Sequence, residues 1–157
     1  MSIASFGITI DLPGTEDLLK GLNVEESGKA QRFFSDTLMR HSDKYVPFES
    51  GILKNSAYVS AGGDFIVYPT VYARYLWYGD LYVDPITLKG AFHDPVSGRF
   101  WSRPYVQKIK DPNGRKLKFN GAPIRGEKWV ERCWENESNT IIEEVKEFIM
   151  RNKTIWQ

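Results

Sequence analysis

Two stretches with helical periodicity, one near each end of the chain, place the strongest constraint on its fold. Between Val24 and Tyr45, apolar side chains recur at three- and four-residue spacing, and Pro47 then stops the helix. Between Gly126 and Asn152 a second stripe recurs, with weaker helix formers at residues 136–139 that allow a bend. Each stripe predicts a long amphipathic helix, and the second comprises Val130, Trp134, Ile141, Val145 and Phe148, widened by Cys133, Ile142 and Ile149.

β-Prone sequence follows the first helix. Two runs, residues 51–59 and residues 65–68, flank a glycine-rich break and predict a β-hairpin. Residues 71–78 predict one or two helical turns that Gly79 terminates, and the β-branched residues 3–10 predict a short strand. Helices and strands in this order place the chain in the α+β class.

The stretch from Asp80 to Pro123 has little sustained periodicity and is rich in proline and glycine. Residues 94–98 and residues 111–114 are turn sequences. Compact domains rarely keep a long irregular segment unless it serves binding. The 157 residues are too few for two comfortable domains. We therefore interpret residues 1–157 as a single α+β domain with an extended basic and aromatic loop region at residues 84–123.

Basic residues concentrate in this region, although the whole chain is balanced. The chain has 21 Lys and Arg against 20 Asp and Glu, and its net charge of +1 provides no general attraction for DNA or an anionic membrane. From Arg99 to Lys128 the only acids are Asp111 and Glu127. The basic residues of that stretch are Arg99, Arg103, Lys108, Lys110, Arg115, Lys116, Lys118, Arg125 and Lys128.

Aromatic residues, at 14% of the chain, are more frequent than a core of this size requires. Aromatic side chains are favoured where a partner covers the surface. Three interpretations of the basic, aromatic stretch stay open. It contacts phosphates while Phe100, Trp101 and Tyr105 stack on bases, it holds solvated charges around a partly buried aromatic cluster, or it contacts the acidic last helix of a neighbouring copy.

No catalytic, cofactor or metal motif is recognisable in the sequence. His41 lies on the apolar face of the first helix, where a packed and satisfied imidazole is expected, and His93 lies beside Asp94 in a loop. A hydrolase centred on His93 and Asp94 is therefore a disfavoured alternative. Cys133, the single cysteine, reads as a buried small hydrophobe and indicates a reducing, cytoplasmic compartment. We expect no enzyme, no cofactor and no metal, and no membrane span because no apolar run approaches ~20 residues.

Several segments together carry a resemblance to a known family. Residues 45–56 follow the first helix with the pattern V-P-x-x-x-G-x-L-x-x-S, and residues 72–79 have the pattern Y-A-x-x-x-x-x-G after the hairpin. Three further segments follow in the same order as in that family: residues 81–85, 90–92 and 100–104. From Tyr45 to Pro104 the chain resembles the minor capsid, tail-completion and head–tail joining proteins of tailed phages and of prophages in Gram-positive bacteria.

That resemblance implies a curved antiparallel β-sheet packed against a long N-terminal and a long C-terminal helix, extended here by the long irregular loop excursion. It implies a structural virion protein of the head–tail junction, assembled in the host cytoplasm as a homo-oligomeric ring. The implied partners are portal or connector proteins and tail-terminator or tail-tube proteins, with non-specific contact to DNA in the channel. The alternative is a nucleic-acid-binding module that uses the stretch from Arg99 to Lys128.

Two sets of candidate site residues follow. The candidate subunit-interface residues are aromatic or lie among aromatics: Trp77, Tyr82, Phe92, Phe100, Trp101, Arg103 and Tyr105. The candidate contacts to channel DNA or to an acidic partner are basic: Lys108, Lys110, Arg115, Lys116 and Lys118.

Overall fold

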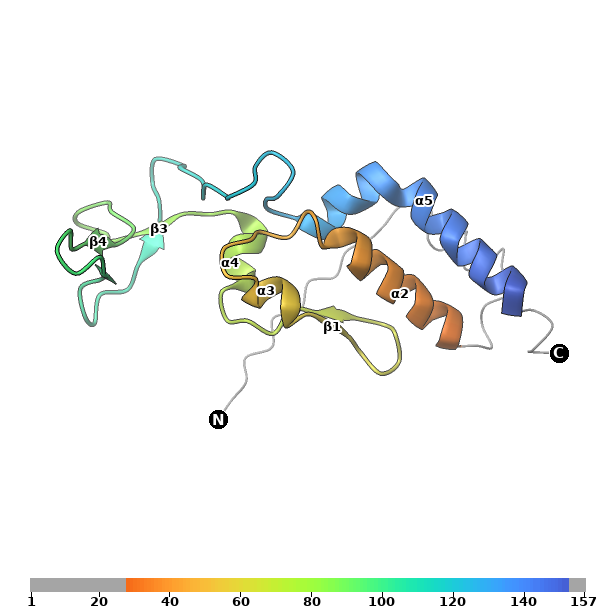
Figure 1. Cartoon of the computed structure of the whole chain (residues 1–157). Helices are drawn as coiled ribbons and strands as arrows, with labels where there is room; N and C mark the ends of the chain where they lie inside the picture. Colours follow the sequence, from red (N-terminus) through yellow and green to blue (C-terminus); the bar gives the residue numbers. More distant parts are fainter. Residues whose placement is uncertain (1–27, 153–157) are drawn as a thin grey trace.

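The computed structural model describes residues 28–152, which form an elongated molecule with a helical body and a projecting arm (Figure 1). The arm comprises residues 80–123, and the remaining described residues form the body. The elements in chain order are α2 (Gly28–Ser42), α3 (Ile52–Asn55), β1 (Tyr58–Val59), β2 (Ile66–Val67), α4 (Ala73–Tyr78), β3 (Tyr82–Val83), β4 (Phe92–His93), β5 (Phe100–Trp101), β6 (Ile109–Lys110) and α5 (Trp129–Asn152).

Helices α2 and α5 lie side by side and supply most of the buried apolar side chains (Figure 1). Phe34 of α2 meets Trp134 of α5 edge to face at 5.9 Å between ring centroids, and Phe33 stacks on Phe148 at 3.9 Å. Burial of a large apolar side chain contributes about 1.5–3 kcal/mol, so this interface dominates the stability of the body. The predicted stripe is confirmed, because these residues of α5 are buried: Val130, Cys133, Trp134, Ile141, Val145 and Ile149.

The bounds of the long helices differ slightly from those expected. α5 begins at Trp129 because Lys128 has a φ of 49°, outside the helical range. The axis of α5 changes direction in its N-terminal half (Figure 1). In the same half, the Asn136 side chain donates a 2.6 Å hydrogen bond to the carbonyl of Arg132. α2 ends at Ser42, ahead of Pro47, and the expected start at Val24 lies outside the described residues, as does the strand expected at residues 3–10.

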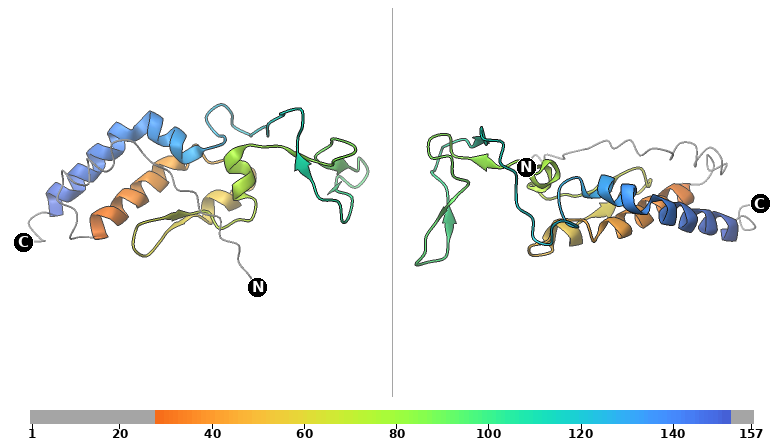
Figure 2. Two further views of the ribbon diagram at one scale, coloured as in Figure 1. Left: turned by 180° about the vertical axis from the view of Figure 1, so that it is seen from behind. Right: turned by 90° about the horizontal axis from the view of Figure 1, so that it is seen from above.

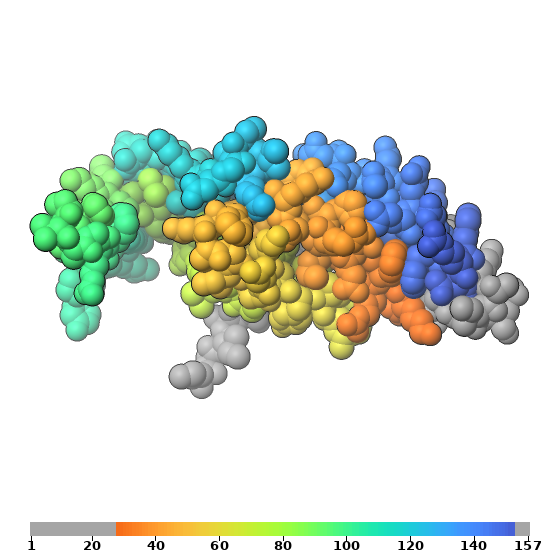
Figure 3. Space-filling model, viewed as in Figure 1, coloured from red at the N-terminus to blue at the C-terminus, as the bar shows by residue number. Residues whose placement is uncertain are grey.

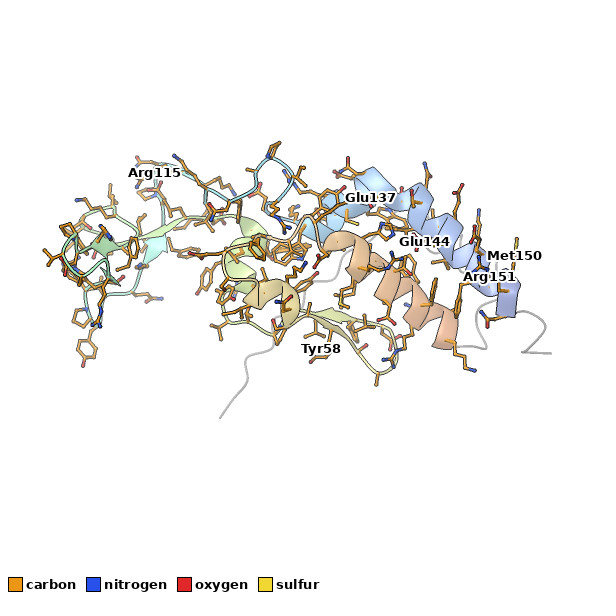
Figure 4. All side chains as sticks on the ribbon, in the orientation of Figure 1. Tyr58, Arg115, Glu137, Glu144, Met150 and Arg151 are labelled. Carbon is orange, nitrogen blue, oxygen red and sulfur yellow. The ribbon has the colours of Figure 1, made fainter. Side chains whose placement is uncertain are left out.

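A polar cluster ties the two long helices together, with Glu137 and Glu144 of α5 labelled in Figure 4. His41 Nδ1 lies 2.6 Å from Glu137 Oε2, and its Nε2 lies 2.9 Å from Glu144 Oε1, so the satisfied imidazole predicted for His41 is confirmed. Tyr45 Oη donates to Glu137 Oε1 at 2.6 Å, and Lys44 Nζ lies 2.5 Å from the same oxygen. Burial would raise the pKa of Glu137, but these three partners outweigh it and hold that pKa at about 2.

Trp129 joins α5 to α4 and to Tyr68, the residue after β2, at the base of the arm. Its ring lies edge-on to Trp77 at 4.8 Å and to Tyr68 at 5.2 Å. Trp77 is 4% exposed, so it belongs to the core and offers no surface to a neighbouring subunit, in contrast to its expected place at an interface. The sequence could not separate the two, because a tryptophan suits either a core or an interface.

The predicted hairpin after α2 is present in a shorter form. β1 pairs antiparallel with β2, Tyr58 opposite Val67 and Val59 opposite Ile66, across the glycine-rich turn. The first part of the expected strand, however, is the helical turn α3. Gly51 enters this turn with a φ of 82°, and the turn buries Leu53. The predicted turns at residues 71–78 are confirmed as α4, which Gly79 ends with a φ of 63°.

The α+β class with two long helices is confirmed, and within residues 28–152 the antiparallel pairing is divided among three two-stranded sheets. β1 pairs with β2, β3 with β6, and β4 with β5. The last two sheets lie in the region expected to be irregular, so the arm is built from short ladders and tight turns. Within residues 28–152, no helix combines the length and the apolarity needed to cross a membrane.

Candidate functional site

The arm is the candidate site, and its stem is a pair of antiparallel segments that leave and re-enter the body. β3 pairs with β6, Tyr82 opposite Lys110 and Val83 opposite Ile109. Nearer the body, the Leu117 amide donates to the carbonyl of Gly79 at 2.9 Å. Both views in Figure 2 show the arm extending from the end of the body opposite the start of α2 and the end of α5. The arm therefore presents its surface away from the core.

Asp80 forms the first of three carboxylate clamps that hold the arm. Its Oδ2 lies 2.7 Å from Lys110 Nζ, and its Oδ1 accepts a 2.7 Å hydrogen bond from Lys116 Nζ. These two ammonium groups lower the pKa of the Asp80 carboxyl. The clamp joins the outgoing and returning chains of the stem.

Asp84 forms the second clamp, in a buried position farther along the arm. Arg103 donates to it through Nε and Nη2, both at 2.6 Å, which is the bidentate geometry that matches guanidinium to carboxylate. The backbone amides of Ile86 and Thr87 donate to Asp84 Oδ1 at 2.9 and 3.0 Å. The Arg103 guanidinium and these amides hold the pKa of Asp84 well below its usual range.

Asp111 forms the third clamp with Arg115, a residue of the arm labelled in Figure 4. Arg115 Nε donates to Asp111 Oδ2 at 2.7 Å, and its backbone amide donates to the same oxygen at 3.0 Å. Arg115 Nη2 also donates to the carbonyl of Leu88 at 2.7 Å, so this side chain crosses between two loops. The guanidinium lowers the pKa of Asp111 to about 2.

The clamps occupy several of the cations that were expected to contact DNA or an acidic partner. Of the five expected phosphate or acidic-partner contacts, Lys110, Lys116 and Arg115 are paired with carboxylates of the arm, and Lys108 donates to the carbonyl of Gly90. Lys118 lies elsewhere, at the base of the arm. A cation already paired with a carboxylate gains less from a phosphate, so we expect these paired cations to attract DNA less strongly than unpaired ones would.

The outer end of the arm is an aromatic hairpin made by β4 and β5, which we call the arm tip (residues 91–101). Phe92 stacks on Trp101 at 4.6 Å with an interplanar angle of 22°, and His93 contacts Phe100 at 4.8 Å. Phe100 is 73% exposed and Trp101 is 51% exposed. In the space-filling view (Figure 3), this end of the molecule stands clear of α2 and α5.

Two matching Asp-Pro turns shape the arm tip and its approach. At Asp94, the amide donates to the Arg99 carbonyl and the carbonyl accepts from the Gly98 amide, both at 2.9 Å. Asp84 makes the same two bonds with Lys89 and Leu88, also at 2.9 Å. Each carboxylate also accepts a backbone amide two residues on. The sequence signal was the repeated Asp-Pro-x-Thr/Ser, which predicted a turn only at its second occurrence.

The structure brings together only part of the expected interface set. Phe92, Phe100 and Trp101 meet at the arm tip, whereas Tyr82 lies at the stem, edge-on to Tyr75 at 5.1 Å. The remaining members have separate places: Arg103 in the second clamp, Tyr105 fully exposed with a φ of 61°, and Trp77 in the core.

The arrangement around His93 and Asp94 does not support hydrolysis. Asp94 Oδ1 accepts the Val96 amide at 3.0 Å, and Oδ2 accepts the Ser97 hydroxyl at 2.5 Å. The Ser97 hydroxyl lowers the pKa of Asp94, and His93 packs against Phe100. Across residues 28–152, no group of three or more His, Cys, Asp or Glu side chains could hold a metal ion.

Sequence reasoning missed an apolar groove at the base of the arm. It has a volume of about 330 Å³ and is lined by residues 47–53, Tyr72, Leu76 and residues 118–120. Three separate segments therefore form one hollow, and Phe48, Ile52 and Tyr72 on its walls are exposed. We call this hollow the base groove.

Comparison with known proteins gives one informative match. A family model described as "Minor capsid protein" matches residues 7–122, which cover α2, the hairpin, α4 and nearly all of the arm. Searches against curated proteins and against solved structures give no significant match.

Proposed function

The chain belongs to the minor capsid protein family of bacteriophages, and from that premise we propose that it joins head to tail as a connector, neck or tail-completion subunit. Members of such a family are structural proteins of the virion, and their work is assembly. We propose that the subunit oligomerises into a ring between the portal or connector and the tail-terminator or tail-tube proteins, around the path of the DNA.

The projecting arm is the observation that carries this proposal. It exposes Phe100 and Trp101 at the end of a paired stem, while its carboxylate clamps hold four of the eight Lys and Arg side chains of residues 80–123 in place. Exposed aromatic surface on a preorganised element is typical of protein–protein contact, since little ordering entropy is lost on binding. This combination favours a subunit that binds neighbouring proteins.

The nucleic-acid-binding alternative has less support. A dedicated binder depends on several cations free to neutralise phosphates. Here Arg103 and Arg115 are engaged in bidentate or bridging contacts, and Lys110 and Lys116 share Asp80. Any contact with channel DNA is therefore secondary to the joining role.

Deletion of the gene tests the proposal. Particles produced without this chain should accumulate as filled or empty heads and free tails, and supplying the chain in trans should restore joined particles. Electron microscopy of lysates counts the three kinds of particle. Infectious, normally joined virions in the deletion background would remove the head–tail joining role.

A further inference from the structure

We propose that the arm tip of one subunit docks into the base groove of a second copy of the same chain, so that the ring closes through head-to-tail contacts. This inference rests on the proposed ring and names its partner and both of its contact faces.

The arm tip has the properties of an anchor. Aromatic side chains bury roughly 150–250 Å² each, so the exposed parts of Phe100 and Trp101 offer on the order of 250 Å². A standard interface buries about 800 Å² on each partner. The two aromatics therefore provide about a third of a complete contact, which is the share expected of a central hot spot surrounded by weaker contacts.

The base groove has the properties of a receptor for such an anchor. Its volume of about 330 Å³ is at the small end of the range of binding pockets, which suits one or two aromatic side chains. Phe48, Ile52 and Tyr72 provide exposed apolar walls. An exposed apolar hollow of this kind is stabilised when another apolar group fills it.

Charge complementarity selects the arm tip as the occupant. Arg99 precedes Phe100, is exposed, and has no ion-pair partner among residues 28–152. Two charged side chains line the groove, Glu49 and Lys118. Glu49 follows Phe48, is exposed, and is likewise without a partner in the described part of the chain. Asp94 forms no ion pair with Arg99, and its two oxygens accept from the Val96 amide and the Ser97 hydroxyl of the turn. An Arg99–Glu49 pair would place a charge pair beside an aromatic contact on each face.

The positions of the two faces require a second copy. The arm tip points away from the body, whereas the base groove lies where the arm leaves it, so a chain cannot fill its own groove (Figure 1). Two different patches on one chain, each complementary to the other, make a heterologous contact. Repetition of that contact gives a closed ring when the rotation between copies divides a full turn.

Cysteine cross-linking of the full-length chain tests the docking. Arg99→Cys marks the arm tip and Glu49→Cys marks the groove, both at exposed positions, while the native Cys133 is fully buried. A disulfide forms only between Cα atoms within about 7 Å. Oxidation of a mixture of the two single variants should give a covalent dimer, and the double variant should give a ladder of oligomers in purified particles. Each single variant alone should give no covalent dimer.

Two results would overturn the docking. Cross-linking of Arg99→Cys with itself would show a symmetric contact between arm tips, and absence of a ladder from the double variant in joined particles would show that the faces do not meet. Glu143→Cys, on the exposed face of α5, replaces Glu49→Cys as a control and should give no dimer with the tip variant. If gene deletion separates heads from tails but no ladder forms, the joining role stands and this docking fails.

Discussion

Glu137 provides the strongest single test of how the helical body is held together. Its carboxylate accepts from Tyr45 and faces His41 and Lys44, which come from the end of α2 and the turn after it, while Glu144 shares His41. The pKa of Glu137 is about 2, against an ordinary value of 4.5. One pH unit between folded and unfolded pKa values corresponds to about 1.4 kcal/mol, so the charged carboxylate stabilises the fold by roughly 3 kcal/mol at neutral pH. Glu137→Gln keeps the shape of the side chain and should lose roughly 2–3 kcal/mol.

The stabilisation by Glu137 should weaken as the pH falls. Because the folded pKa of Glu137 lies below the unfolded one, the stabilisation is complete above about pH 4.5 and disappears as the pH falls towards 2. Urea unfolding followed by tryptophan fluorescence reports the free energy of unfolding, since Trp129, Trp134 and Trp77 are all buried. The difference between wild type and Glu137→Gln should be present at neutral pH and should shrink from pH 4.5 to pH 3.

Glu143→Gln is the matched control. Glu143 lies on the exposed face of the same helix, without a partner among residues 28–152, so this variant should stay within about 0.5 kcal/mol of wild type. Carboxylates outside this cluster also titrate in acid, but they are common to wild type and variant and cancel in the difference. The reasoning is refuted if the two variants are equally stable at pH 7, or if the cost of Glu137→Gln grows on acidification.

Three further predictions concern the core, the arm tip and the arm's charges. Phe34→Ala removes a buried ring packed on Trp134 and should cost roughly 3–5 kcal/mol in urea unfolding, whereas Met150→Ala, at an exposed position of α5 labelled in Figure 4, should change stability by less than about 0.5 kcal/mol. Gly98→Ala places a side chain at a φ of 67° with open space around it, so the substitution costs about 1–2 kcal/mol through backbone strain alone. Hydrogen exchange of the β4 and β5 amides should therefore be roughly 5- to 30-fold faster, and unchanged exchange would contradict the turn geometry. The affinity for duplex DNA, measured by fluorescence anisotropy, should depend only weakly on salt concentration. Lys116→Gln should leave this dependence unchanged because Lys116 is paired with Asp80. A dependence as steep as that of about six or more phosphate contacts would restore the nucleic-acid alternative.

The long helices could be predicted because their signal is local. Residues three and four apart share a helix face, so the stripe containing Ile141 and Val145 is visible without knowing what covers it. The strands of the arm could not be predicted in the same way. β3 and β6 contain two residues each, and Tyr82 pairs with Lys110 across a long stretch of intervening chain. Neither strand has enough residues to show an alternating pattern.

The character of the site also depended on distant contacts. The stretch from Arg99 to Lys128 contains nine basic residues and two acidic ones, so it looks strongly basic in the sequence. In the fold, however, Asp80 and Asp84, which precede this stretch, form ion pairs with Lys110 and Arg103. The base groove was hidden for a related reason, because three segments contribute to it. Trp77 was expected at a subunit interface but lies in the core, where it packs against Trp129. Its residue type alone could not distinguish these two positions.

The location of this chain in the assembled virion is the most direct test of its proposed role. Cryo-electron microscopy of intact particles, reconstructed at the junction between head and tail, would resolve the paired helices α2 and α5 and the projecting arm as a recognisable shape. We expect a ring of these subunits between the portal and the tail, with each arm reaching the adjacent copy. Its occurrence only in the capsid shell or at the far end of the tail would contradict the head–tail joining function.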